Sequence, residues 1–145
     1  MNPERFQKLA RALRGRQPDL TVLLERVHKS HNLSAILRNC DAVGVFEAHA
    51  IPSEESLQIH PHTSAGTAKW VRLVRHRTIH GAMEELKDRG FRVLAAHPGP
   101  DTVDFREADY TVPTALMMGG ELLGLSDEAL TLADQRISIP MVGMA

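Results

Sequence analysis

The sequence contains only one cysteine, Cys40, so the chain cannot form an internal disulfide bond. It has no run of about 18 apolar residues, the length that a membrane-spanning helix requires, and its N-terminus lacks the apolar segment of a signal peptide. These absences argue against a disulfide-stapled secreted domain and against a membrane protein, and we expect a cytoplasmic protein. The 145 residues, 43% hydrophobic and 24% charged, are ordinary for one globular domain.

Several common catalytic and metal-binding patterns are also missing. The chain has no G-x-G-x-x-G dinucleotide fingerprint, no P-loop lysine and no serine in a G-x-S-x-G turn. His28 and His31 are close in sequence, as are His60 and His62, but no cysteine or acidic residue stands beside them at the spacing of zinc ligands. We therefore expect no bound metal.

The net charge of −1 hides a strong asymmetry along the chain. Residues 1–38 carry eight Lys and Arg against three acidic residues, a net charge of +5, whereas the remainder carries nine against fifteen, a net charge of −6. Four of these cations recur every three residues and would form one stripe on a helix, here called the basic stripe: Arg5, Lys8, Arg11 and Arg14. The stripe is either a solvated helix face or a surface that binds a polyanion such as RNA.

Helical and extended patterns alternate along the chain. We expect strands at 19–27, 45–51, 70–74, 91–97, 114–119 and 136–140. We expect helices near the N-terminus, from Leu33 onward, between Thr78 as N-cap and Gly90 as C-cap, and after Ser126 as N-cap. Residues 52–69, rich in Pro, Ser, Thr and His, predict a long loop. This alternation predicts a single α/β domain with a mostly parallel sheet flanked by helices.

In parallel α/β sheets, ligands bind beyond the carboxyl ends of the strands, so the segments after strands are the informative ones. Asn32 precedes a predicted helix, where it would serve as N-cap. Two adjacent glycines and Glu121 follow a strand within residues 119–124. Residues 139–144 form an apolar segment containing glycine that could line a flat aromatic ligand. Each segment also has a plain structural reading, as a helix cap, an ordinary turn or part of the core.

One stretch resembles a known motif closely. Residues 27–45, VHKSHNLSAILRNCDAVGV, contain N-x-x-A-I-x-R, which is similar to motif 1 of the SPOUT methyltransferases. Three further segments, 16–25, 103–119 and 128–144, resemble the TrmH subfamily in the expected order. The resemblance extends over nearly the whole chain.

This resemblance implies a fold, an activity and partners. TrmH-like proteins are homodimers with a trefoil knot, and they transfer a methyl group from S-adenosylmethionine to the ribose 2′-hydroxyl of guanosine 18 in the tRNA D-loop. It implies a tRNA-binding helical extension at residues 1–18 and a methyltransferase core at 19–145. The residues expected to contact RNA are those of the basic stripe, together with Arg16 and His31.

The resemblance also assigns site residues. It places Asn32, Arg38 and Glu121 in the catalytic site. The expected cofactor-binding residues are Ala96, Gly119, Ile139, Met141 and Gly143. Because a guanidinium stays protonated, Arg38 is a poor general base. Its expected role is to clamp ribose and phosphate oxygens and to stabilise the developing alkoxide.

The family continues beyond the point that corresponds to Ala145 with a Q-S-L-N-V-S segment, motif 3, and with the helix that closes the knot. The chain has no counterpart, so we expect a polypeptide ending at Ala145 not to methylate tRNA. Two alternatives stay open: a 2′-O-methyltransferase that acts on another RNA such as ribosomal RNA, and an RNA-binding remnant without catalytic activity.

Overall fold

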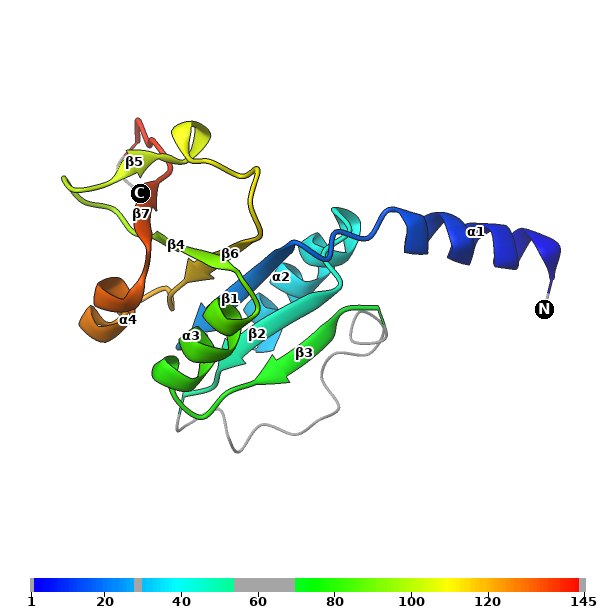
Figure 1. The fold of residues 1–145 in the computed structure, drawn as a ribbon, viewed down its shortest axis with the longest axis horizontal. Helices are drawn as coiled ribbons and strands as arrows, with labels where there is room; N and C mark the ends of the chain where they lie inside the picture. Colours follow the sequence, from blue (N-terminus) through cyan, green and yellow to red (C-terminus); the bar gives the residue numbers. More distant parts are fainter. Residues whose placement is uncertain (1, 28–29, 54–69, 144–145) are drawn as a thin grey trace.

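One seven-stranded sheet forms the centre of the structure, a computed structural model that describes residues 2–27, 30–53 and 70–143. The strand order is β3-β2-β1-β6-β4-β7-β5, and every pair of neighbouring strands is parallel (Figure 1). The strands are β1 Leu20–Glu25, β2 Glu47–Ile51, β3 Arg72–Arg75, β4 Arg92–Ala96, β5 Val103–Asp104, β6 Thr114–Met118 and β7 Gln135–Ser138. The predicted parallel α/β fold is confirmed, while the trefoil knot stays a prediction.

Helices cover both faces of this sheet. They are α1 Pro3–Arg14, α2 Ser30–Ala42, α3 Ile79–Asp88 and α4 Asp127–Leu132, with a short 3-10 turn at Phe105–Glu107. Leu23 of β1 packs in a core cluster with α3 and α4, whereas its neighbours Val22 and Leu24 pack in a second cluster with α2. This alternation between two buried faces explains why β1 is almost uniformly apolar.

Cys40 lies in the cluster beneath α2 and is 4% exposed, which confirms its predicted place in the core. Burial raises the pKa of its thiol, an effect that outweighs the opposing backbone hydrogen bond. Because the reactive form of cysteine is the thiolate, this residue is not a nucleophile at neutral pH.

The predicted helix ends are correct in part. The side chains of Thr78 and Ser126 cap α3 and α4 by accepting hydrogen bonds from the third residue onward. Gly90 follows the C-cap residue Arg89 and has a φ of 82°, a conformation that glycine adopts without strain. The prediction that Asn32 is an N-cap is wrong, because α2 begins at Ser30 and Asn32 lies inside its first turn.

The edge strand β5 and the 3-10 turn after it were not predicted. A strand of two residues is too short to show a sequence period, and its position is fixed by pairing with β7. Most of the predicted loop at 52–69 lies outside the described residues, as do His28, His60 and His62. Among the described helices, none is long and apolar enough to cross a membrane.

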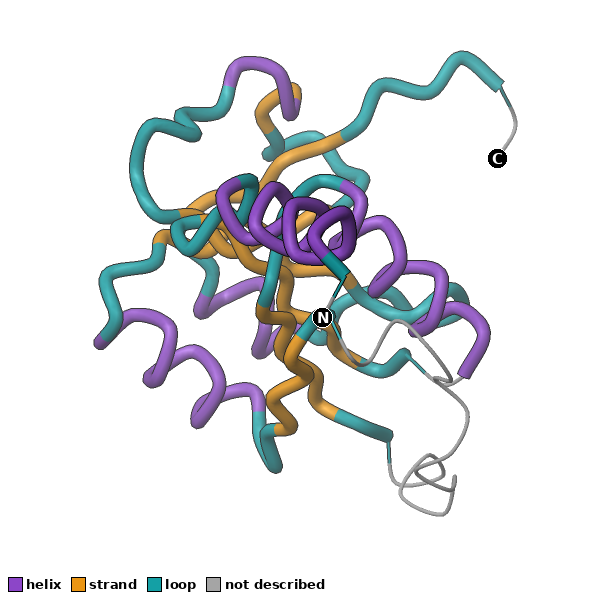
Figure 2. Tube along the Cα trace, turned by 90° about the vertical axis from the view of Figure 1, so that its right-hand side faces the viewer, coloured by secondary structure: helices purple, strands orange, loops and turns teal. Residues whose placement is uncertain are grey.

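Helix α1 extends away from the sheet and buries none of its residues (Figure 1). The sequence starts it in the expected way, with Pro3 at the first turn and the Asn2 side chain accepting a hydrogen bond from the Glu4 amide. At the other end of the chain, residues after β7 also run away from the packed elements (Figure 2). Both segments present side chains to the surroundings.

Candidate active site at the carboxyl edge of the sheet

Three predicted cofactor segments follow neighbouring strands. In the sheet, β4 lies between β6 and β7, and the register pairs Ala95 with Met117 and Ala96 with Ile137. The three strands therefore end at the same edge, and since neighbouring strands are about 4.8 Å apart, their ends lie within roughly 10 Å of one another. We call this place, where Ala96, Gly119 and Ile139 follow or end strands, the carboxyl-edge site.

The loop after β6 is closed tightly by its glycines. The amide of Gly124 donates a hydrogen bond to the Gly120 carbonyl over 2.9 Å. A Cβ atom on Gly119 would lie 2.1 Å from the carbonyl carbon of Gly124, and one on Gly120 would lie 2.4 Å from the carbonyl oxygen of Arg26. The two adjacent glycines thus allow the loop to fold on itself and against the end of β1. The tip of the loop, at Leu122 and Leu123, is exposed.

A buried carboxylate anchors the same region. Glu25, at the end of β1, is 5% exposed and accepts hydrogen bonds of 2.7 Å from both the amide and the hydroxyl of Ser126. Ser126 is the N-cap of α4, so Glu25 ties the end of β1 to the start of that helix. The sequence analysis missed this residue, although an acidic side chain ending the otherwise apolar run LTVLLE was a signal for it.

The predicted catalytic residues Asn32 and Glu121 are brought together. The Asn32 side-chain amide donates a hydrogen bond to the Glu121 carboxylate, with 2.7 Å between Nδ2 and Oε1. This bond joins the first turn of α2 to the loop after β6. It also explains what the Asn32 side chain does in place of capping the helix.

Arg38 does not share a helix face with Asn32. Six residues separate the two on α2, which corresponds to a rise of about 9 Å and a rotation of about 120° around the helix axis. Arg38 is exposed, and side chains on a helix lean toward its N-terminus, here the end that lies near the Glu121 loop. The Arg38 guanidinium is thus accessible to solvent on the α2 side of the sheet.

The remaining predicted residues fall into two groups. Ile139 and Met141 are 65% and 64% exposed, and a Cβ atom on Gly143 would meet no atom within 4 Å. The basic stripe is exposed on α1, which in Figure 1 lies on the opposite side of the molecule from β4 and β7. His31 is exposed on α2.

Arg16 differs from the basic stripe. Its guanidinium pairs with Asp41 over 2.7 Å and also donates to the Val45 carbonyl over 3.3 Å. With 14% of its side chain exposed, Arg16 fastens the segment after α1 to the end of α2. This contact gives Arg16 a structural role beside its predicted role in RNA binding.

Comparison with known proteins identifies the relatives of this fold. Residues 19–145 match the model of the SpoU rRNA Methylase family. The chain belongs to this family. The matched range covers all seven strands and begins after α1, so the parallel sheet and its carboxyl-edge site are features of a SpoU methylase.

Two relatives within the SpoU family are named tRNA (guanosine(18)-2′-O)-methyltransferase. The protein from Thermus thermophilus is 56% identical over 140 residues, which are 97% of this chain and 72% of the relative. The protein from Escherichia coli K12 is 50% identical over 144 residues, which are 99% of this chain. The chain spans 63% of the length of that relative.

Solved structures agree with these relatives. The structure of a TrmH/SpoU tRNA modifying enzyme of A. aeolicus superposes with a TM-score of 0.85 at 40% identity, over 98% of this chain and 73% of that one. The methyltransferase AviRb from Streptomyces viridochromogenes, solved in complex with AdoMet, gives a TM-score of 0.72 at 27% identity, over 86% of this chain and 49% of that one.

Proposed function

We propose that this protein transfers a methyl group from S-adenosylmethionine to the ribose 2′-hydroxyl of guanosine 18 in tRNA. The observation that carries the proposal is the convergence of the segments at Ala96, Gly119 and Ile139 on one edge of the sheet. The two relatives that share half or more of its residues are named for this reaction.

The residues at the carboxyl-edge site fit the proposed cofactor. The exposed side chains of Ile139 and Met141 offer an apolar surface to a flat adenine base, and the chain beyond each strand end offers backbone donors and acceptors for its polar edge. AviRb, a SpoU methyltransferase, has been solved in complex with AdoMet. S-Adenosylmethionine, when bound, supplies a sulfonium methyl group that is already electrophilic.

The protein then has to position the ribose and assist the loss of one proton. We assign the catalytic role to Arg38, whose exposed planar guanidinium can hold ribose and phosphate oxygens with parallel hydrogen bonds. As a cation it stabilises negative charge that develops on the 2′-oxygen, while a phosphate oxygen is the candidate acceptor for the proton.

Asn32 and Glu121 act together in this proposal. Their 2.7 Å hydrogen bond fixes the loop after β6 against the start of α2, and this loop follows the strand that carries Gly119. The pair therefore holds one wall of the cofactor site at a fixed distance from the helix that bears Arg38. Both residues serve the reaction by positioning unless the bound substrate also touches them.

We infer that the basic stripe binds the tRNA backbone, since its four side chains are exposed and lie on a helix that packs none of its residues in the core. We also propose that the protein is a homodimer. Apolar side chains that a dimer interface would cover are exposed near the carboxyl-edge site: Leu122, Leu123, Ile139, Met141 and Val142.

Methyl transfer from radiolabelled S-adenosylmethionine tests the proposed substrate. We expect label in a tRNA transcript with guanosine at position 18 and none in a matched transcript with adenosine there. A 23S rRNA fragment tests the second candidate, which the rRNA methylase description of the family favours. Equal labelling of the two tRNAs, or label in the rRNA alone, would contradict the proposal.

Calorimetry separates an enzyme from a non-catalytic RNA-binding protein. We expect S-adenosylmethionine to bind the protein in the absence of RNA, because the carboxyl-edge site is built from the sheet itself. A protein that bound tRNA but gave no heat of cofactor binding would be an RNA-binding remnant.

A further inference from the structure

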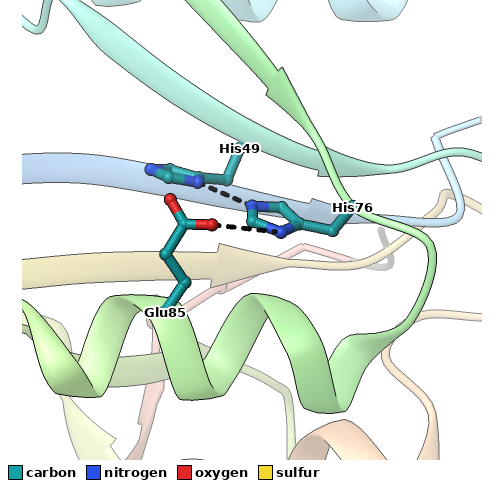
Figure 3. Close-up of side chains that lie close together, drawn as sticks. All are labelled: His49, His76 and Glu85. Carbon is teal, nitrogen blue, oxygen red and sulfur yellow. Dashed lines mark hydrogen bonds and ion pairs between the residues drawn. The ribbon is translucent and has the colours of Figure 1, made fainter.

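Two histidines and a glutamate from three elements meet at the other end of the strand order (Figure 3). His49 lies on β2, His76 directly follows β3, and Glu85 lies on α3. One ligand atom of each lies within 4.8 Å of the others. We call His49, His76 and Glu85 the histidine cluster.

The geometry within the histidine cluster is close. His49 Nδ1 lies 2.8 Å from His76 Nε2, and the two rings stack with their centroids 5.1 Å apart. His76 Nδ1 lies 3.7 Å from Glu85 Oε2. All three side chains point toward one another in Figure 3.

One nitrogen of the cluster is buried without a hydrogen bond. The His49 side chain is fully buried, and its Nε2 has no hydrogen-bond partner among the described residues. The nearest carboxylate oxygen, Oε1 of Glu47, is 3.2 Å away but out of line for a hydrogen bond. A buried polar atom left unpaired costs about 1–3 kcal/mol, so its persistence calls for an explanation.

We propose that His49, His76 and Glu85 bind one Zn²⁺ ion, with water in the fourth position. Two imidazole nitrogens and one carboxylate oxygen are a ligand set that zinc takes in proteins. Magnesium and calcium prefer oxygen ligands and do not suit this set. The cluster has a route to solvent through Glu85, whose side chain is 45% exposed.

The distances need only a small adjustment. Two nitrogens bound to one tetrahedral zinc at about 2.05 Å each are about 3.3 Å apart. His49 Nδ1 and His76 Nε2, now 2.8 Å apart, would separate by roughly half an ångström as the ion replaces their shared proton. Glu85 would give up its contact with Arg89, which at 3.7 Å between Oε1 and Nη1 is a long one.

Glu47 supplies the outer support that zinc-binding histidines usually have. A histidine bound to metal through one nitrogen typically donates its other N–H to a carboxylate. If His49 binds through Nδ1, its Nε2 proton faces Glu47, which Arg89 holds in place over 2.6 Å. The unpaired nitrogen then gains a partner after a small rotation of the ring.

Zinc binding at this cluster does not depend on methyl transfer. The strand order places β1 between β2 and the strands of the carboxyl-edge site, so the histidine cluster is a separate place on the sheet. The sequence analysis did not find it, because it looked for ligands close together in sequence and these residues come from three elements.

Isothermal titration of the chelator-treated protein with Zn²⁺ alone tests the proposal. We expect one ion per chain, and we expect His76→Gln and Glu85→Gln each to weaken binding at least tenfold. His80→Gln is the matched control: it removes an exposed histidine of the same helix as Glu85, paired with Glu128 outside the cluster. Binding with no defined stoichiometry, or equal affinity in all four proteins, would overturn the proposal.

Thermal unfolding gives a second readout that does not require catalysis. An ion that binds only the folded protein raises its Tm, so Zn²⁺ should stabilise the wild type and His80→Gln but not Glu85→Gln. Because Glu85 is largely at the surface, its substitution preserves the fold and decides the question even if His76→Gln does not fold. A Tm increase of wild-type size in Glu85→Gln would refute the site.

Discussion

Replacing Gly119 with alanine is a sharp test of how the loop after β6 is built. The added Cβ would lie 2.1 Å from the carbonyl carbon of Gly124 and 2.3 Å from the amide nitrogen of Leu125. Carbon atoms in contact prefer roughly 3.5–4.0 Å, so the backbone of the loop has to move by more than an ångström. Such overpacking typically costs about 1–3 kcal/mol, well below the roughly 5–15 kcal/mol stability of a domain.

We therefore expect Gly119→Ala to fold, with a stability reduced by that amount in urea unfolding followed by circular dichroism, and to lose affinity for S-adenosylmethionine. Gly143→Ala is the matched control, since a Cβ there meets nothing within 4 Å, and its stability should stay within about 0.5 kcal/mol of the wild type. Wild-type stability and cofactor affinity in Gly119→Ala would refute the description of the loop.

Three further variants test the proposed roles. Arg38→Ala should keep the fold and cofactor affinity but lower kcat about 10²–10³-fold, with only partial rescue by lysine, which lacks the planar fork; an active alanine variant would rule out the assignment. Neutralising the whole basic stripe should reduce the log–log salt slope of tRNA binding by about one for each phosphate that the helix no longer neutralises, with little effect on turnover at saturating tRNA; an unchanged slope would mark a merely solvated face. Asn32→Ala and Glu121→Ala should impair methyl transfer non-additively, because each breaks the same hydrogen bond; strictly additive losses would show that the two residues act separately.

The sequence was sufficient for the fold because its periodic signals are strong. β1 is apolar along its length since both faces of the strand are covered, and α3 shows a clear apolar stripe between two end signals. The same logic located the carboxyl-edge site: ligands bind where parallel strands end, and three suspected segments follow strands that proved to be neighbours.

What the sequence could not supply are contacts between residues far apart in the chain. The Asn32–Glu121 bond spans 89 positions and the Glu25–Ser126 contacts span 101, and neither has a local signature. The N-cap prediction for Asn32 failed for this reason, because its side chain has a distant partner. The histidine cluster depends in the same way on the pairing of β2 with β3 and the packing of α3 beside them.

The most direct test of the central claim is the position of the methyl group on tRNA. The 145-residue chain and the same chain continued with the C-terminal part of the Thermus thermophilus relative would each be incubated with S-adenosylmethionine and tRNA, and the nuclease fragments analysed by mass spectrometry. We predict that the continued chain adds one methyl group to guanosine 18, and none when that nucleotide is 2′-deoxyguanosine. Methylation of the deoxy substrate at position 18, or of another nucleotide instead, would contradict the account.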